Sequence, residues 1–279
     1  MTDVPIPADP SKKPDVVGGV RGTRKPTGLP SWPVLLLAGR EKTGKSYQAA
    51  AASASELVGR TFWVGFGEKD PDEYGAIPGA RFEIVDHNGT LADMAAAIRW
   101  AAVQPAEDGK PNLLVLDSAT LVWDTLKDKA TFLATKRGST DRNGEVVVGM
   151  DLWNKVNQEW AGVLTAVRSH KGPVILTARL DTVAVIGANG KPTTAKTEKV
   201  KGQRSLAYDV DAIVEMPERG IATLTGARSV IHKLPARTDL PEFDKGGVDW
   251  LWRKLGLDRH QVAQPTYTDA VTEDASLFA

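Results

Sequence analysis

The sequence predicts an α/β fold in which helices cover both faces of a mostly parallel central sheet. Two observations lead to this fold class. Apolar runs of strand length recur along the chain, at residues 33–38, 61–66, 112–116 and 173–177. Segments with helical composition or spacing alternate with these runs, at residues 91–103 and 151–169. Strands that alternate with helices join into one parallel sheet through right-handed crossover connections.

Each expected element has a local sequence signal. The run at 33–38 precedes a glycine-containing turn, and an alanine-rich helix starts at Ser46. The run at 112–116 is apolar, as a strand buried on both faces requires. Residues 212–216 and 221–225 are expected to form a two-stranded hairpin. The helix at 151–169 places its apolar side chains near helical spacing, at Leu152, Val156, Trp160, Leu164 and Val167.

The composition excludes several classes of protein. The chain has 279 residues, of which 42% are hydrophobic, so it can bury a substantial core. It contains no cysteine, which excludes disulfides, thiol catalysis and cysteine metal sites. The 35 basic and 35 acidic residues give a net charge of zero, so any nucleic-acid site must be local. The sequence has no signal peptide and no apolar run of about 18 residues, so we expect a cytoplasmic protein without a membrane partner.

The chain is expected to have one folded core between two flexible ends. Residues 1–30 are rich in proline and glycine and are expected to form a disordered arm. Residues 31–258 hold the alternating strands and helices of the core. Residues 259–279 are expected to form a flexible acidic tail that ends in Leu277 and Phe278 before the last alanine. This tail is either a frayed end or a docking motif for a single-strand-binding protein or a sliding clamp.

The most informative motif is the octapeptide from Gly39 to Ser46, which fits the P-loop pattern G-x-x-x-x-G-K-[ST]. It lies between an expected strand and an expected helix, which points backbone N–H groups and a helix N-terminus at phosphates. Lys45 is expected to reach the β and γ phosphates of ATP, and the Ser46 hydroxyl to bind Mg²⁺. An ordinary glycine turn is the alternative. The expected nucleotide-binding residues are Gly39, Arg40, Glu41, Lys42, Thr43, Gly44, Lys45, Ser46 and Tyr47.

Two carboxylates are expected at the same sheet edge as the P-loop. Asp117 ends the apolar run at 112–116 in the form of a Walker B motif, and is expected to orient Mg²⁺. An aspartate that caps a strand–helix turn is the alternative. Glu68 follows the strand at 61–66, where a carboxylate can polarise a water for attack on the γ phosphate. From its chemistry alone, Glu68 could equally be a surface charge.

The order of these motifs resembles that of the RecA-like core ATPases, over roughly residues 31–240. The segment that starts at Glu68 resembles the catalytic glutamate segment of that family, and residues 116–121 resemble its Walker B motif. Residues 174–179 and 202–213 resemble the sensor strand and the segment after the second DNA loop. The chain looks closest to short phage-encoded RecA-like proteins, described as single-strand annealing or recombination ATPases. The resemblance implies a RecA-like P-loop core, ATPase activity and, for a phage protein, a location in the host cytoplasm.

The resemblance also implies roles for two further basic residues. Arg179 ends the sensor strand, where RecA itself has a glutamine, and is expected to sense the γ phosphate. Lys233 is expected to reach the nucleotide of a neighbouring subunit, with an ordinary exposed hairpin as the alternative. The family therefore implies a homo-oligomer, either a ring or a filament.

Single-stranded DNA is the partner that the resemblance implies, held by two mobile loops. Two basic groups fall in the matching gaps, one after the Walker B strand and one after the sensor strand. Both are punctuated by glycine, and both are expected to be loops at the nucleotide edge of the sheet. Solvated charged loops are the alternative. The expected DNA contacts are Lys136, Arg137 and Arg142 in the first group, and Lys196, Lys199, Lys201 and Arg204 in the second.

The sequence thus predicts a Mg²⁺-dependent, DNA-stimulated ATPase that acts on single-stranded DNA in phage-type homologous recombination or strand annealing. One alternative is a P-loop ATPase of another class, such as a replication motor or helicase loader. A loader of that kind would need a helical lid domain, and the 38 residues after Pro241 are too few for a lid and the tail. Another is a small-molecule P-loop kinase, which needs an arginine-rich lid where this chain has lysine-rich segments. A binding module with a vestigial ATPase is a third.

Overall fold

The computed structural model describes residues 23, 25–187, 190–230, 235, 237–258 and 262–267. Within these residues the chain forms one sheet in the order β3-β2-β4-β5-β1-β7-β8-β9, with β6 paired to β5. The pairings from β3 to β7 along this order are parallel, whereas β8, β9 and β6 add antiparallel strands. The strands are β1 (Val34–Gly39), β2 (Thr61–Gly65), β3 (Phe82–Ile84), β4 (Leu113–Asp117), β5 (Val174–Ile186), β6 (Pro192–Lys201), β7 (Ala212–Glu218), β8 (Ile221–Ala227) and β9 (Thr238–Asp239).

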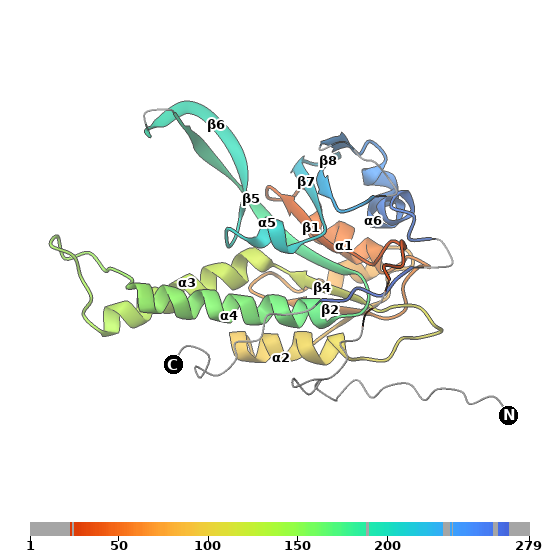
Figure 1. Cartoon of the computed structure of the whole chain (residues 1–279), viewed down its shortest axis with the longest axis horizontal. Helices are drawn as coiled ribbons and strands as arrows, with labels where there is room; N and C mark the ends of the chain where they lie inside the picture. The colour runs from red at the N-terminus through yellow and green to blue at the C-terminus, as the bar shows by residue number, and fades with distance from the viewer. Residues whose placement is uncertain are drawn as a thin grey trace.

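Helices cover both faces of this sheet, so the predicted α/β fold class is confirmed (Figure 1). One face packs against α2 (Leu91–Ala102), α3 (Ala119–Lys136) and α4 (Met150–Ser169). The other face packs against α1 (Lys45–Ala52) and α6 (Phe243–Lys254). A 3-10 turn, η1 (Asp72–Ala76), and a single-turn helix, α5 (Leu206–Asp209), complete the helical elements of the described residues.

Strand β1 shows why the sheet needs two covered faces. Its side chains alternate, with Leu36 and Ala38 in the core of α2–α4, and Leu35 and Leu37 in the core of α1 and α6. All four are fully buried, so each face of β1 removes apolar surface from water. The strand therefore lies rigidly in the middle of the sheet and holds the turn that follows it.

The first predicted DNA loop is wrong in part: residues 119–136 form the helix α3, and only the residues after Lys136 form a connection. Its buried residues Val122, Leu126, Ala130 and Ala134 recur every four positions, so an apolar period is present. Two of the four are alanines, whose small side chains bury little area yet let α3 lie close to α4. Lys136 is the last residue of this helix, and Arg137 and Arg142 follow in the connection to α4.

The second predicted DNA loop is a two-stranded β-ribbon that projects from the sheet (Figure 1). Strand β5 does not end at the predicted residue 177 but continues to Ile186 and pairs with β6. The ribbon starts at the pair Arg179 and Lys201 and runs outward to Ile186 and Pro192. A ribbon that is held by its own hydrogen bonds can carry exposed polar side chains on both faces.

The predicted ends of the core need one adjustment. Residues 262–267, predicted as tail, are held by hydrogen bonds: Ala263 N donates at 2.8 Å to the carbonyl oxygen of Pro30, the last residue of the predicted arm. The Tyr267 hydroxyl donates to Asp211 Oδ2 at 3.0 Å. The remainder of the predicted tail, like residues 1–22 of the arm, lies outside the described residues. Among the helices that are described, none has the length and apolar character to cross a membrane.

Candidate nucleotide site

The turn between β1 and α1 has a shape that only glycine permits at two positions. A Cβ on Gly39 would lie 2.5 Å from Thr43 Oγ1 and 2.7 Å from Met216 O, so the backbone packs too closely for any side chain. Gly44 has φ 98°, in the left-handed region that costs other residues energy. The Thr43 hydroxyl closes the turn by donating to Arg40 O at 3.1 Å. The result is a tight loop that leads into the N-terminus of α1.

The Lys45 ammonium lies across this loop. Its Nζ donates to Gly39 O at 3.0 Å and to Arg40 O at 2.7 Å. Burial lowers the pKa of Lys45, and the carboxylates of Asp117 and Glu68 oppose this shift. The charge is thus held in a partly desolvated place beside the loop amides, where its attraction for a phosphate is stronger than in water.

Asp117 ends β4 and is buried, with 4% of its surface exposed. Thr177, at the end of the apolar part of β5, donates a hydrogen bond to Asp117 Oδ1. Burial raises the pKa of the Asp117 carboxyl above its usual range, and hydrogen bonds from Thr177 and Ser46 oppose this shift. Ser46 belongs to the first turn of α1, so the structure brings the two expected Mg²⁺ ligands into contact.

Glu68 lies at the same edge because β2 pairs with β4, with Gly65 beside Asp117. Its Oε1 accepts hydrogen bonds from Arg179 Nη2 at 2.8 Å and from Ser118 Oγ at 3.2 Å. The Glu68 side chain keeps 32% of its surface exposed and remains open to water. Its surroundings therefore fix its position without burying it.

Arg179 joins this group to the P-loop. It is the register partner of Gly39 across the parallel pair of β5 and β1. Its backbone N–H donates to Thr120 Oγ1 at 2.9 Å, and the Thr120 hydroxyl donates to Lys201 O at 2.6 Å. The guanidinium thus stands between the P-loop and Glu68, where a positive charge can neutralise a terminal phosphate.

These residues fit a nucleoside triphosphate with Mg²⁺. The loop packs too closely for a Cβ at Gly39, and the Lys45 ammonium already lies against the carbonyl oxygen of Gly39. Among the described residues there is no group of three or more His, Asp or Glu that could hold a metal unaided. Mg²⁺ typically takes few protein ligands and completes its shell with water and phosphate oxygens, so Ser46 and Asp117 suffice.

Four polar residues of the site were not predicted from the sequence. Ser118, Thr120 and Thr177 hold the charged groups, and each has 2% or less of its surface exposed. The sequence signal that could have found them is a polar residue at the end of an apolar strand. Tyr74 of η1 packs edge-on against Tyr47 of α1 with ring centroids 6.3 Å apart, beside the P-loop. Tyr47 is 46% exposed, so this pair offers an aromatic surface next to the loop.

The predicted DNA contacts are separated by the fold. Lys196, Lys199 and Arg204 are exposed on or just after the ribbon, and Lys201 at its start contacts Asp124 Oδ2 at 3.3 Å. The other group lies at the far end of α3, where Arg137 pairs with Asp151 at 2.5 Å. Lys233 lies outside the described residues, so its predicted role stays a prediction.

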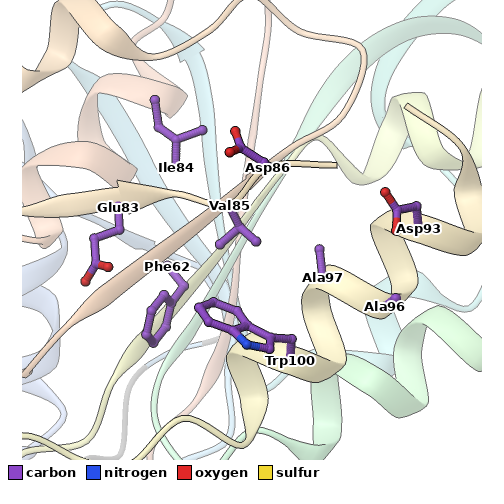
Figure 2. A pocket seen from close by; sticks show the side chains of 9 residues that line it. All are labelled: Phe62, Glu83, Ile84, Val85, Asp86, Asp93, Ala96, Ala97 and Trp100. Atoms are coloured by element: carbon purple, nitrogen blue, oxygen red, sulfur yellow. The ribbon is translucent and has the colours of Figure 1, made fainter. Parts of the chain in front are cut away.

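A groove of about 470 Å³ lies away from this site, between edge strand β3 and helix α2. Figure 2 shows Trp100 of α2 facing Phe62 of β2 and Val85, with the Trp100 and Phe62 rings 5.5 Å apart. Glu83 on its rim is paired with Arg60 through hydrogen bonds of 2.8 and 2.7 Å. Strands β2, β4 and β5 separate β3 from the P-loop strand, so this groove is not part of the nucleotide site.

The fold and the site together define a P-loop ATPase. A family model described as "AAA domain" matches residues 33–237, which cover most of the chain and every described residue of the site. The chain therefore belongs to this AAA domain family, and its fold is an α/β P-loop core with a mostly parallel sheet. The sequence has no match among the curated proteins.

Two solved structures are similar to the chain. The first is "Crystal structure of the RadB recombinase", with 16% identity, a TM-score of 0.41, and coverage of 72% of this chain and 83% of that one. The second is a "prototypical ATPase from the type III secretion system of pathogenic bacteria", with 15% identity and a TM-score of 0.36. That match covers 67% of this chain and 54% of the other.

Proposed function

We propose that this P-loop ATPase hydrolyses ATP with Mg²⁺ and acts on single-stranded DNA, in homologous recombination or strand annealing. The observation that carries hydrolysis is the position of Glu68. It is held at 2.8 Å by Arg179 and at 3.2 Å by Ser118, beside Asp117, and keeps its open side to water. A fixed carboxylate at that place can orient a water and accept its proton.

The other residues of the site supply charge and position. Lys45 would neutralise charge on the β and γ phosphates, and Ser46 and Asp117 would hold Mg²⁺, which would supply further positive charge for the phosphates. Arg179 is a register partner of Gly39 and can turn from Glu68 to the charge that develops on the γ phosphate. Tyr47 and Tyr74 offer an aromatic face to the nucleotide base.

The β5–β6 ribbon supports the choice of DNA as the partner. Lys199 and Lys201 are two positions apart on β6 and lie on the same face as Arg179, the partner of Lys201. Lys196 is exposed further out on the opposite face. A basic ribbon of this kind can follow a phosphate backbone without reading its sequence. One strand of the ribbon is the outer part of β5, which also carries Arg179, so DNA bound to the ribbon would lie next to the ATPase site.

Assembly is also part of the proposal. We propose a homo-oligomer, as a ring or filament, in which Lys233 reaches a neighbouring nucleotide. The residues at the end of the chain, with Leu277 and Phe278, are proposed to dock a single-strand-binding protein or a sliding clamp. Both proposals rest on the resemblance and on the sequence of these segments.

The test is ATP turnover by wild type and Glu68→Gln, with and without single-stranded DNA. Glu68→Gln should bind nucleotide as wild type does and lose turnover by at least about 100-fold, because the amide cannot accept the proton. Wild type should turn over faster when single-stranded DNA is added. Equal loss of binding and turnover would show a structural role for Glu68. Turnover that ignores DNA would favour a motor of another class.

A further inference from the structure

An ion pair joins the P-loop to the ribbon. Arg40, the second residue of the P-loop octapeptide, donates from its Nε to Glu198 Oε1 of β6 at 2.5 Å. The two residues are 158 positions apart in the chain, so only the fold brings them together. The Arg40 side chain is 46% exposed and that of Glu198 24% exposed. The pair is thus open to exchange with other charged groups.

The backbone of Arg40 is part of the P-loop. Its carbonyl oxygen accepts hydrogen bonds from Lys45 Nζ at 2.7 Å and from Thr43 Oγ1 at 3.1 Å, so its backbone belongs to the phosphate cradle. A guanidinium binds a carboxylate and a phosphate in the same forked geometry. A triphosphate carries more negative charge than one glutamate, which favours the exchange of partner.

We propose that Glu198 and the nucleotide phosphates compete for Arg40, so that nucleotide binding releases the outer ribbon from the P-loop. The inference rests on nucleotide binding by the P-loop, and it does not require DNA. Such coupling is reciprocal. If nucleotide binding weakens the pair of Arg40 and Glu198, removal of the Glu198 carboxylate must strengthen nucleotide binding by the same free energy. Glu198 is then a residue that tunes the P-loop from outside it.

The root of the ribbon has separate ties that the exchange leaves in place. Thr120 donates to Lys201 O at 2.6 Å, and Lys201 Nζ contacts Asp124 at 3.3 Å. Both ties are made to residues of α3 and do not involve the Arg40 side chain. Glu198 is three residues further out, so its release frees the ribbon beyond its root without disturbing the sheet. The expected change is therefore local and reversible.

The first test measures affinity for a non-hydrolysable ATP analogue with Mg²⁺. Glu198→Gln should tighten binding about two- to five-fold, the range that an exposed ion pair supports. Glu83→Gln is the matched control, since it removes the same charge from the exposed pair with Arg60 at the sheet edge. It should leave affinity unchanged. Equal tightening in both variants, or none in Glu198→Gln, would overturn the proposal.

A second set of variants, made in a protein that carries Arg40→Gln, separates competition for Arg40 from long-range repulsion between Glu198 and the nucleotide. If Glu198 acts through Arg40, then Glu198→Gln should have no effect on affinity in a protein that already carries Arg40→Gln. If the full tightening persists there, Glu198 acts on the nucleotide through space and the proposed exchange is wrong. The double-mutant cycle thus assigns the effect to one pair of side chains.

The second readout follows the ribbon itself. The chain has no cysteine, so Thr194→Cys on exposed β6 gives a single site for a nitroxide spin label. The analogue should increase label mobility in the otherwise wild-type chain. With Glu198→Gln added, the label should be mobile already and should not respond. An unchanged label in both proteins would refute the release, even if ATP turnover and its DNA stimulation behave as proposed.

Discussion

The β5–β6 ribbon and the α3–α4 arm both carry basic residues, yet they stand in different relations to the nucleotide site. The α3–α4 arm is α3, α4 and the connection between them, at residues 119–169. The ribbon is a continuation of β5, the strand that supplies Thr177 and Arg179. The arm starts next to Asp117, but α3 carries the chain roughly 27 Å away over its 18 residues, at about 1.5 Å per residue. The ribbon therefore has direct contacts with the site, and the tip of the arm has none in the described residues.

This difference teaches that closeness in sequence and closeness in space can be opposite. Lys136 is 19 positions after Asp117 and far from it, whereas Glu198 contacts Arg40 across 158 positions. A helix moves the chain steadily along its axis, while a returning strand brings distant residues into register. A ligand on the ribbon can influence catalysis through side chains in contact, and a ligand on the arm cannot do so directly.

The largest expected effect is at the P-loop, which follows the strand β1 that pairs with β5. Lys45→Ala should lower ATP turnover by at least about 100-fold, because phosphoryl transfer depends on charge placed at the β and γ phosphates. Steady-state phosphate release is the measurement, and a circular dichroism spectrum like that of wild type shows that the variant is folded. Turnover near wild type would remove the P-loop from the catalytic site.

The next effect separates the ribbon from the arm. Replacing Lys196 and Lys199 by glutamine should lower the slope of log affinity against log salt for single-stranded DNA by roughly 1.4 units, about 0.7 for each phosphate that a lysine no longer neutralises. DNA stimulation of ATP turnover should fall as well, because the ribbon adjoins Arg179. Binding titrations at several salt concentrations, with turnover assays beside them, give both quantities.

The matched variant replaces Lys136 and Arg142 on the arm. Both residues are exposed and distant from the site, so this change should leave basal turnover as in wild type. If the arm also binds DNA, affinity should fall but turnover at saturating DNA should be kept. The comparison fails if the arm variant loses stimulation and the ribbon variant keeps it.

The sequence predicted the parts of the fold that local signals encode. The strands that hold Gly39 and Asp117, and the strand that precedes Glu68, were expected within one or two residues, since apolar runs bounded by polar turns specify buried strands. The P-loop was found because glycine is required there by backbone geometry. The five apolar positions expected on α4 are all buried, because large side chains at helical spacing are a strong signal.

Features that depend on distant contacts were missed. The packing face of α3 includes Ala130 and Ala134, and alanine gives a weak apolar signal although it is buried there. The ribbon was missed because its strands carry exposed polar residues and are held by each other. The Arg40 contact with Glu198 and the Glu68 contact with Arg179 arise from the order of strands in the sheet, which no local pattern contains.

A smaller effect concerns the stability of the site. The folded-state pKa of Asp117 is raised by burial, so its contribution to stability is present below the usual aspartate pKa and is lost as pH rises through the raised value. Asp117→Asn should therefore increase the free energy of unfolding of the nucleotide-free protein near neutral pH, by about 0.5–2 kcal/mol. Urea unfolding at a series of pH values should show this gain shrinking as pH falls. A loss of stability near neutral pH would contradict it.

The smallest expected effect is a decrease in stability, and it concerns Asp151 on the α3–α4 arm. Asp151 lies in the first turn of α4, and its hydrogen bond with Arg137 lowers the pKa of its carboxyl. The ionised Asp151 carboxylate therefore contributes to the stability of the fold above the usual aspartate pKa, and this contribution is lost as pH falls through the lowered pKa. Asp151→Asn should slightly decrease stability near neutral pH, and the difference from wild type should vanish in acid. The same urea series measures it, and ATP turnover should be unchanged because the arm tip does not touch the site. An ionised carboxylate is expected to destabilise the fold at Asp117 and to stabilise it at Asp151. A shift of stability in the same direction for Asp117→Asn and Asp151→Asn near neutral pH would contradict this difference.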